Sequence, residues 1–203
     1  NMLPGLIEAA LANRARQQDS VRLFEFGQTF VPTDDGLRQA LQVGGLLWGR
    51  RHAESWHAGS DLVDFYDAKG VIDGLLAWAG LGEVSFQGAG NTVLHPGQSA
   101  NIVLGDSVIG RVGRLHPEIE AKLDFSGAFV FELNADSVMA RPRRIYAGIS
   151  RYPSVRRDFA VVVDQAVTAA DVEGVVREAL GSILVDFRLF DVYVGKGIDS
   201  NEK

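Results

Sequence analysis

The stretch at residues 92–119 reads TVLHPGQSANIVLGDSVIGRVGRLHPEI, and it constrains the fold more than any other part of the chain. Two β-rich runs, residues 101–104 and 107–109, flank the dipeptide Gly105-Asp106. A Gly-X pair between two such runs is typical of a two-residue hairpin turn. Gly110 and Gly113 follow in the returning run and indicate a bulge or a close backbone approach. The stretch therefore predicts an antiparallel hairpin.

The rest of the first three quarters of the chain mixes helical and strand patterns. Apolar residues recur at helical spacing or alternate with period two, which predicts helices at 4–18 and 64–81, a helix beginning at Pro117, and strands at 21–31, 39–49 and 128–133. Antiparallel strands interspersed with helices indicate an α+β domain.

The last fifty residues follow a different pattern. A β-rich run at 158–164 precedes a helix at 169–180, which begins with the near-capping-box Thr168-Ala-Ala-Asp171. An alternating strand at 183–194 follows. These three elements predict a β-α-β unit, which corresponds to the first half of a ferredoxin-like β-α-β-β-α-β domain.

Charge marks the boundary between the two parts. Residues 141–157 hold six arginines, two prolines and no acid, although the whole chain has a net charge of −6. We place the boundary near Gly148, which gives domains at 1–148 and 149–203. The overall acidity argues against a protein that is basic all over, so any nucleic-acid contact must be local. The chain has no cysteine, which excludes disulfides and thiolate metal sites and fits a cytoplasmic location.

Two histidines stand in front of prolines, at His95-Pro96 and His116-Pro117. As a metal or catalytic pair they would need further ligands or a nucleophile, and no motif of that kind accompanies them. The residue before a proline is restricted to extended geometry, which favours a strand end or a turn. We therefore interpret His95, Pro96, His116 and Pro117 as structural, and we predict no catalytic residue and no metal ligand in this chain.

The arginine-rich stretch is the best candidate for binding RNA. Its cations could contact phosphates, and Tyr146 and Tyr152 between them could stack on a base. The alternative is a solvated linker whose arginines pair with acids such as Asp158 or Asp191. Composition alone leaves both interpretations open.

Eight ordered blocks of the sequence resemble one family. They are LPGL at 3–6, RLFEFG at 22–27, DFYDAKG at 64–70, LHPGQSA at 94–100, IGRVGRLHP at 109–117, SRYPSVRRD at 150–158, LFDVY at 189–193 and GKG at 195–197. In order and spacing they resemble the C-terminal part of the bacterial phenylalanine–tRNA ligase beta subunit, and the resemblance covers essentially the whole chain.

The resemblance implies that domain 1–148 is a catalytically inactive class II synthetase-like domain, an antiparallel sheet with helices that packs against the catalytic alpha subunit in an α2β2 enzyme. It implies that domain 149–203 is the first half of a ferredoxin-fold anticodon-binding domain that meets tRNA(Phe). Arg151, Arg156, Arg157 and Lys196 match the family's blocks and are the candidate RNA contacts. The holoenzyme would use ATP and Mg²⁺ on the alpha subunit, so this chain would need no cofactor of its own.

The resemblance also makes the chain a fragment of a longer beta subunit. We expect it to be inactive alone, to lie in the cytoplasm, and to contact neither a membrane nor DNA. Two alternatives stay open at this point: an interaction scaffold without RNA binding, and a stand-alone enzyme that uses His95 and His116.

Overall fold

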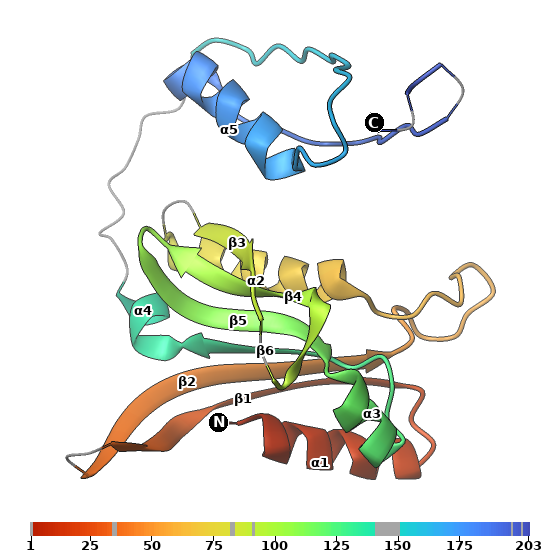
Figure 1. Ribbon diagram of the computed structural model, residues 1–203, viewed down its shortest axis with the longest axis vertical. Helices are drawn as coiled ribbons and strands as arrows, with labels where there is room; N and C mark the ends of the chain where they lie inside the picture. The colour runs from red at the N-terminus through yellow and green to blue at the C-terminus, as the bar shows by residue number, and fades with distance from the viewer. Residues whose placement is uncertain are drawn as a thin grey trace. The chain divides into compact units, whose positions relative to one another are not determined.

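The computed structural model describes residues 2–33, 36–81, 84–90, 92–140, 151–195, 197–199 and 201–203 (Figure 1). The chain divides into two units, Asn1–Ile145 and Tyr146–Lys203, and each is described by itself. The boundary expected at Gly148 falls within 141–150, outside the described residues. None of the helices in the described ranges is long and apolar enough to cross a membrane.

The first unit is built on a six-stranded sheet in which every neighbouring pair is antiparallel. Its strands are β1 (Ser20–Thr33), β2 (Gly36–Gly49), β3 (Val84–Gly88), β4 (Leu94–Leu104), β5 (Ser107–Leu115) and β6 (Phe129–Asn134). Their order across the sheet is β1-β2-β6-β5-β4-β3. The antiparallel α+β prediction is therefore confirmed.

The predicted hairpin is the β4–β5 pair. Leu104 pairs with Ser107 across the turn, and Gly105 has a φ of 58°, a conformation that glycine adopts without strain. The close approach predicted at Gly110 and Gly113 is confirmed. A Cβ at Gly113 would lie 2.6 Å from the Cβ of Ser99, because the strands meet there with a shifted register.

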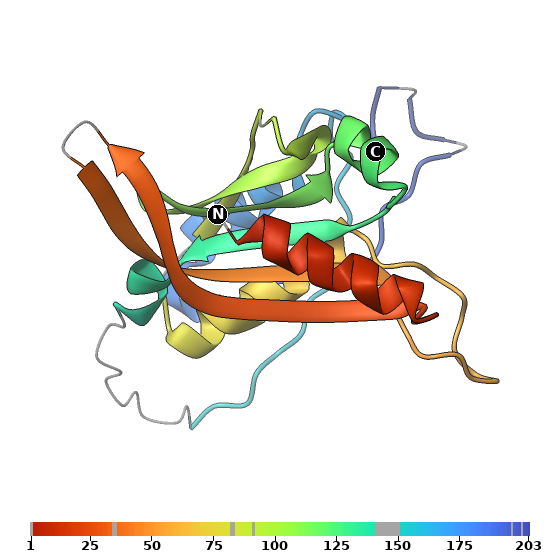
Figure 2. The ribbon, with the colours of Figure 1, turned by 90° about the horizontal axis from the view of Figure 1, so that it is seen from below.

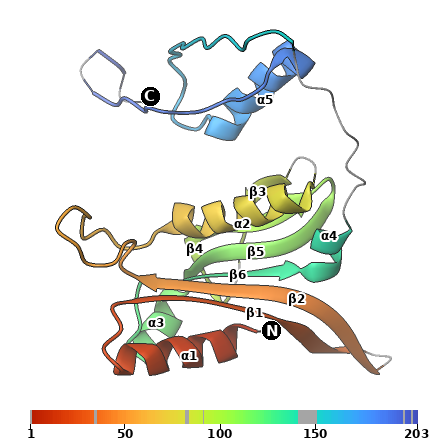
Figure 3. The same cartoon turned by 180° about the vertical axis from the view of Figure 1, so that it is seen from behind.

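Helices cover both faces of this sheet, as Figure 3 shows. On one face α2 (Phe65–Ala79) and α4 (Ala135–Met139) pack over a core that includes Ile72, Val112 and Leu133. On the other face α1 (Leu3–Ala15) and α3 (Pro117–Leu123) cover a second core. Figure 2 shows α1 lying across the β1–β2 hairpin.

The period-two alternation of side chains predicted for β1 is present. The face that carries the phenylalanines is the exposed one. Val21 is buried against α1, whereas the side chains on the opposite face include Phe24 and Phe26, which are 82% and 55% exposed. Only β2 pairs with β1 among the described residues. The outer hairpin is thus a sheet with a helix on one face and exposed phenylalanines on the other.

Two elements of the first unit were not predicted. The strand β3 has only five residues, and α4 is a five-residue helix directly after β6. Neither is long enough to show a clear hydrophobic period. Asn134 caps α4 by accepting a hydrogen bond from the Ser137 N–H at 2.9 Å, so an Asn-x-x-Ser pattern was the available signal.

The second unit contains α5 (Ala169–Leu180) and a short 3₁₀ turn, Gly181–Ile183. The predicted cap is confirmed, because Thr168 Oγ1 accepts from the Asp171 N–H and Asp171 accepts from the Thr168 N–H. The expected strands at 158–164 and 183–194 need correction: the described residues of this unit form one isolated bridge, Asp164–Glu202, and no ladder. In a split β-α-β unit another strand lies between these two, whereas here the backbone of Val163 and Gln165 bonds to Lys203 and Asn201.

Candidate functional site

The two His-Pro motifs lie side by side at the open end of the β4–β5 pair. Leu94 is paired with Leu115, and the His116 N–H donates to the Val93 carbonyl at 2.9 Å. His116 caps α3 through its Nδ1, which accepts from the Glu118 N–H at 3.3 Å. The Nδ1 of His95 accepts from the Gly97 N–H at 3.0 Å. Each imidazole therefore uses one nitrogen to fix the turn that its own proline begins.

A metal site at this position would require more acidic or imidazole ligands. No group of three or more His, Asp or Glu side chains within the described ranges is arranged to hold a metal ion. The histidines are thus brought close in the fold, but no cluster of ligands forms around them.

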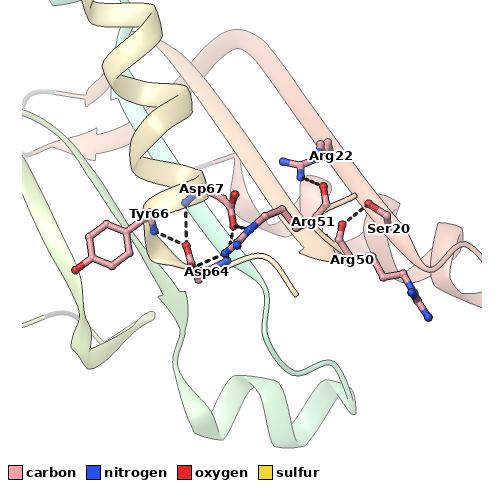
Figure 4. Close-up of polar contacts among 7 residues, drawn as sticks. All are labelled: Ser20, Arg22, Arg50, Arg51, Asp64, Tyr66 and Asp67. Carbon is pink, nitrogen blue, oxygen red and sulfur yellow. Dashed lines mark hydrogen bonds and ion pairs between the residues drawn. The ribbon is translucent and has the colours of Figure 1, made fainter. Parts of the chain in front are cut away.

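A polar cluster joins the loop after β2 to the start of α2 (Figure 4). The Arg51 guanidinium donates to Asp64 Oδ2 at 2.7 Å and to Asp67 Oδ2 at 3.0 Å. Asp64 caps α2 and forms a reciprocal capping box with Asp67. Arg22 donates to the Arg51 carbonyl at 2.8 Å, and Ser20 donates to the Arg50 carbonyl at 2.9 Å.

The charges in this cluster neutralise each other. The hydrogen bond to Asp67 raises the pKa of Arg51 above its ordinary value, and partial burial opposes this rise. Partial burial acts to raise the pKa of Asp67, but the Asp64 N–H and the Arg51 guanidinium outweigh it and lower that pKa below its usual value. Both groups stay ionised and paired at neutral pH. The cluster anchors a loop and leaves no carboxylate poised as a general base.

Two buried glutamates form two further ion pairs of the first unit, and sequence reasoning missed both pairs. Glu132 and Glu120 are each 6% exposed. Glu132 accepts from Arg111 Nη2 at 2.6 Å and from the Met2 N–H at 2.7 Å, so it ties α1 to the sheet. The available signal was an acid at an alternating position inside the apolar run FVFEL at 129–133.

Glu120 holds α3 in place. Arg114 donates to both of its carboxylate oxygens, at 2.9 and 2.7 Å, and the Gly127 N–H donates at 2.7 Å. Burial alone would raise the pKa of Glu120, but the Arg114 and Gly127 hydrogen bonds lower that pKa below its ordinary value. In the described part of the chain, no buried side-chain nitrogen or oxygen lacks a hydrogen-bond partner. The buried polar groups of this unit are therefore structural.

The candidate RNA contacts described in the second unit are all exposed. Arg156 pairs with Asp158 at 2.9 Å, as the linker interpretation expected for this acid, and its guanidinium lies 6.0 Å from the Phe190 ring centroid. Arg157 donates to the Arg156 carbonyl at 3.2 Å. Arg151 is exposed two residues before Pro153. Lys196 and the arginines within 141–150 lie outside the described residues.

Solved structures of tRNA synthetases have a similar fold. A pyrrolysyl-tRNA synthetase from Desulfitobacterium hafniense superposes with a TM-score of 0.51 and 14% identity, over 68% of this chain and 48% of that one. A second structure of that organism's enzyme gives a TM-score of 0.50 at 13% identity, with 68% and 47% covered. The sheet and its helices thus have the core fold of a tRNA synthetase.

Sequence comparison is more specific than the fold. Residues 1–135 match the phenylalanyl tRNA synthetase beta chain CLM domain, and residues 150–203 match the ferredoxin-fold anticodon binding domain. The phenylalanine–tRNA ligase beta subunits of Pseudomonas syringae pv. tomato and Pectobacterium atrosepticum are 43% and 46% identical over 100% and 98% of this chain. The chain belongs to the phenylalanine–tRNA ligase beta subunit family. It spans 26% of the length of each of these two relatives.

Proposed function

We propose that this chain is a non-catalytic part of a phenylalanine–tRNA ligase, an enzyme that attaches phenylalanine to tRNA(Phe) during translation in the cytoplasm. Residues 1–148 support the catalytic alpha subunit in an α2β2 assembly, and residues 149–203 take part in recognising the tRNA. The observation that carries the proposal is the agreement of both units, in order and over the whole chain, with beta subunits of this ligase.

The arginine–carboxylate ion pairs within the first unit favour a supporting role for this unit over a catalytic one. The carboxylates of Glu120, Glu132 and Asp67 are each held by an arginine, so they do not fit the requirements of Mg²⁺-ATP. In the proposed enzyme the alpha subunit binds ATP and Mg²⁺. No observation on the described residues favours the stand-alone enzyme based on His95 and His116.

The local hydrogen bonds of His95 and His116 support structural roles for the two His-Pro motifs. Pro96 and Pro117 then restrict the backbone so that the imidazole can reach the N–H two residues ahead. Pro117 also begins α3, where its missing N–H costs nothing.

The RNA-binding role of the second unit is assigned to Arg151, Arg156 and Arg157, with Lys196 as a fourth candidate. The three arginines are exposed, which leaves their guanidinium groups accessible to phosphates, and the Phe190 ring beside Arg156 offers a surface for stacking. The ion pair between Arg156 and Asp158 is exposed and therefore weak, so a phosphate can replace the carboxylate.

The test uses the complete beta subunit assembled with its alpha subunit. The double variant Arg151→Ala/Arg156→Ala should weaken tRNA(Phe) binding about tenfold and lower the slope of log affinity against log salt by about one to two. Arg188→Ala is the matched control, because Arg188 is an exposed arginine of the same unit. Unchanged affinity and salt slope would contradict the RNA role. Aminoacylation or phenylalanine-dependent pyrophosphate exchange by the chain without alpha subunit would contradict the non-catalytic role.

A further inference from the structure

We draw no further inference here: the strongest candidate, the exposed ring pair of Trp56 and His57 in the loop between β2 and α2, carries none because nothing in the structure shows what covers it.

Discussion

The two units of the chain contain the same kind of capped helix in opposite surroundings. In the first unit, α2 begins with the Asp64–Asp67 capping box and buries Ala68, Ile72 and Leu76 against the sheet. In the second unit, α5 begins with the Thr168–Asp171 box and buries no residue. The difference shows that a strong start signal and an apolar stripe produce a helix in both units, but a core forms only where a sheet has its neighbouring strands in place.

The test with the largest expected effect on stability compares two leucine-to-alanine variants, one in each unit. Leu133→Ala should destabilise the chain by about 2–5 kcal/mol, since Leu133 is fully buried between the sheet and α2. Leu189→Ala in the second unit should change stability by less than about 0.5 kcal/mol, because Leu189 is exposed. Urea unfolding followed by far-UV circular dichroism, which reports on the helices of both units, measures both values. Equal losses would mean that the second unit has a core of its own.

The ion pair between Arg114 and Glu120 of α3 gives the next largest expected effect on stability. Arg114→Ala should cost about 2–3 kcal/mol, because it leaves the Glu120 carboxylate buried with fewer hydrogen bonds. Arg177→Ala on α5, which removes an exposed pair with Glu173, is the control and should cost at most about 0.5 kcal/mol. The same unfolding experiment compares them. A loss at Arg114 no larger than that at Arg177 would contradict the structural role of the buried pair.

Glu120 also sets a pH dependence for the first unit. Its folded pKa is depressed, so the stabilisation that it contributes is fully present above its unfolded pKa of about 4.3 and is lost as the pH falls through the lower folded pKa. Wild-type chain should therefore lose stability steeply below about pH 4.3, whereas Glu120→Gln should give a flatter curve. Unfolding midpoints measured from pH 3 to 7 test this, and parallel curves would refute it.

The two capping boxes allow a matched comparison of smaller effects. Asp64→Ala should lower global stability by about 1 kcal/mol, because α2 is part of the cooperative core. Thr168→Ala should leave the main unfolding transition unchanged and should speed amide hydrogen exchange only within α5. Hydrogen exchange with mass spectrometry resolves the two helices. A shift of the main transition by Thr168→Ala would show that the two units unfold together.

The His-Pro turns give the smallest effects. His116→Ala should cost about 0.5–1 kcal/mol through the lost cap of α3, and His95→Ala should cost no more than that. In the complete ligase these variants should change stability or assembly and leave the catalytic rate of the assembled enzyme unchanged. A normally assembled enzyme with a selective loss of rate would instead support a catalytic role for the histidines.

Local signals in the sequence predicted much of the first unit. The turn at Gly105, the close approach at Gly113 and the helix start at Pro117 each depend on a few neighbouring residues. The pairs Arg114–Glu120 and Arg111–Glu132 were not predictable in the same way, since an ion pair between adjacent strands or elements depends on register and not on one residue's neighbours. The strand at 21–31 was predicted correctly, but which of its faces is open depends on where α1 packs.

The second unit shows what apolar alternation in a sequence cannot predict. Its apolar alternation at 183–194 predicted a strand, yet alternation reports only that a segment suits a sheet and says nothing of whether a neighbouring strand is present. The candidate arginines were predicted from charge and from the family's blocks, and the RNA contact itself depends on a partner that no single chain contains.

The exposed phenylalanine face of β1 has a consequence for handling the chain in solution. β1 is a 14-residue edge strand whose backbone groups on the outer side pair with no described strand, and Phe24, Phe26 and Phe30 are exposed beside them. An uncovered edge with exposed apolar side chains is a template for adding a strand from another molecule. Pro32 protects only the tip of the hairpin, where it removes one N–H. We therefore expect purified chain to self-associate as its concentration rises, and a Phe26→Lys variant to remain monodisperse at concentrations where the wild type does not.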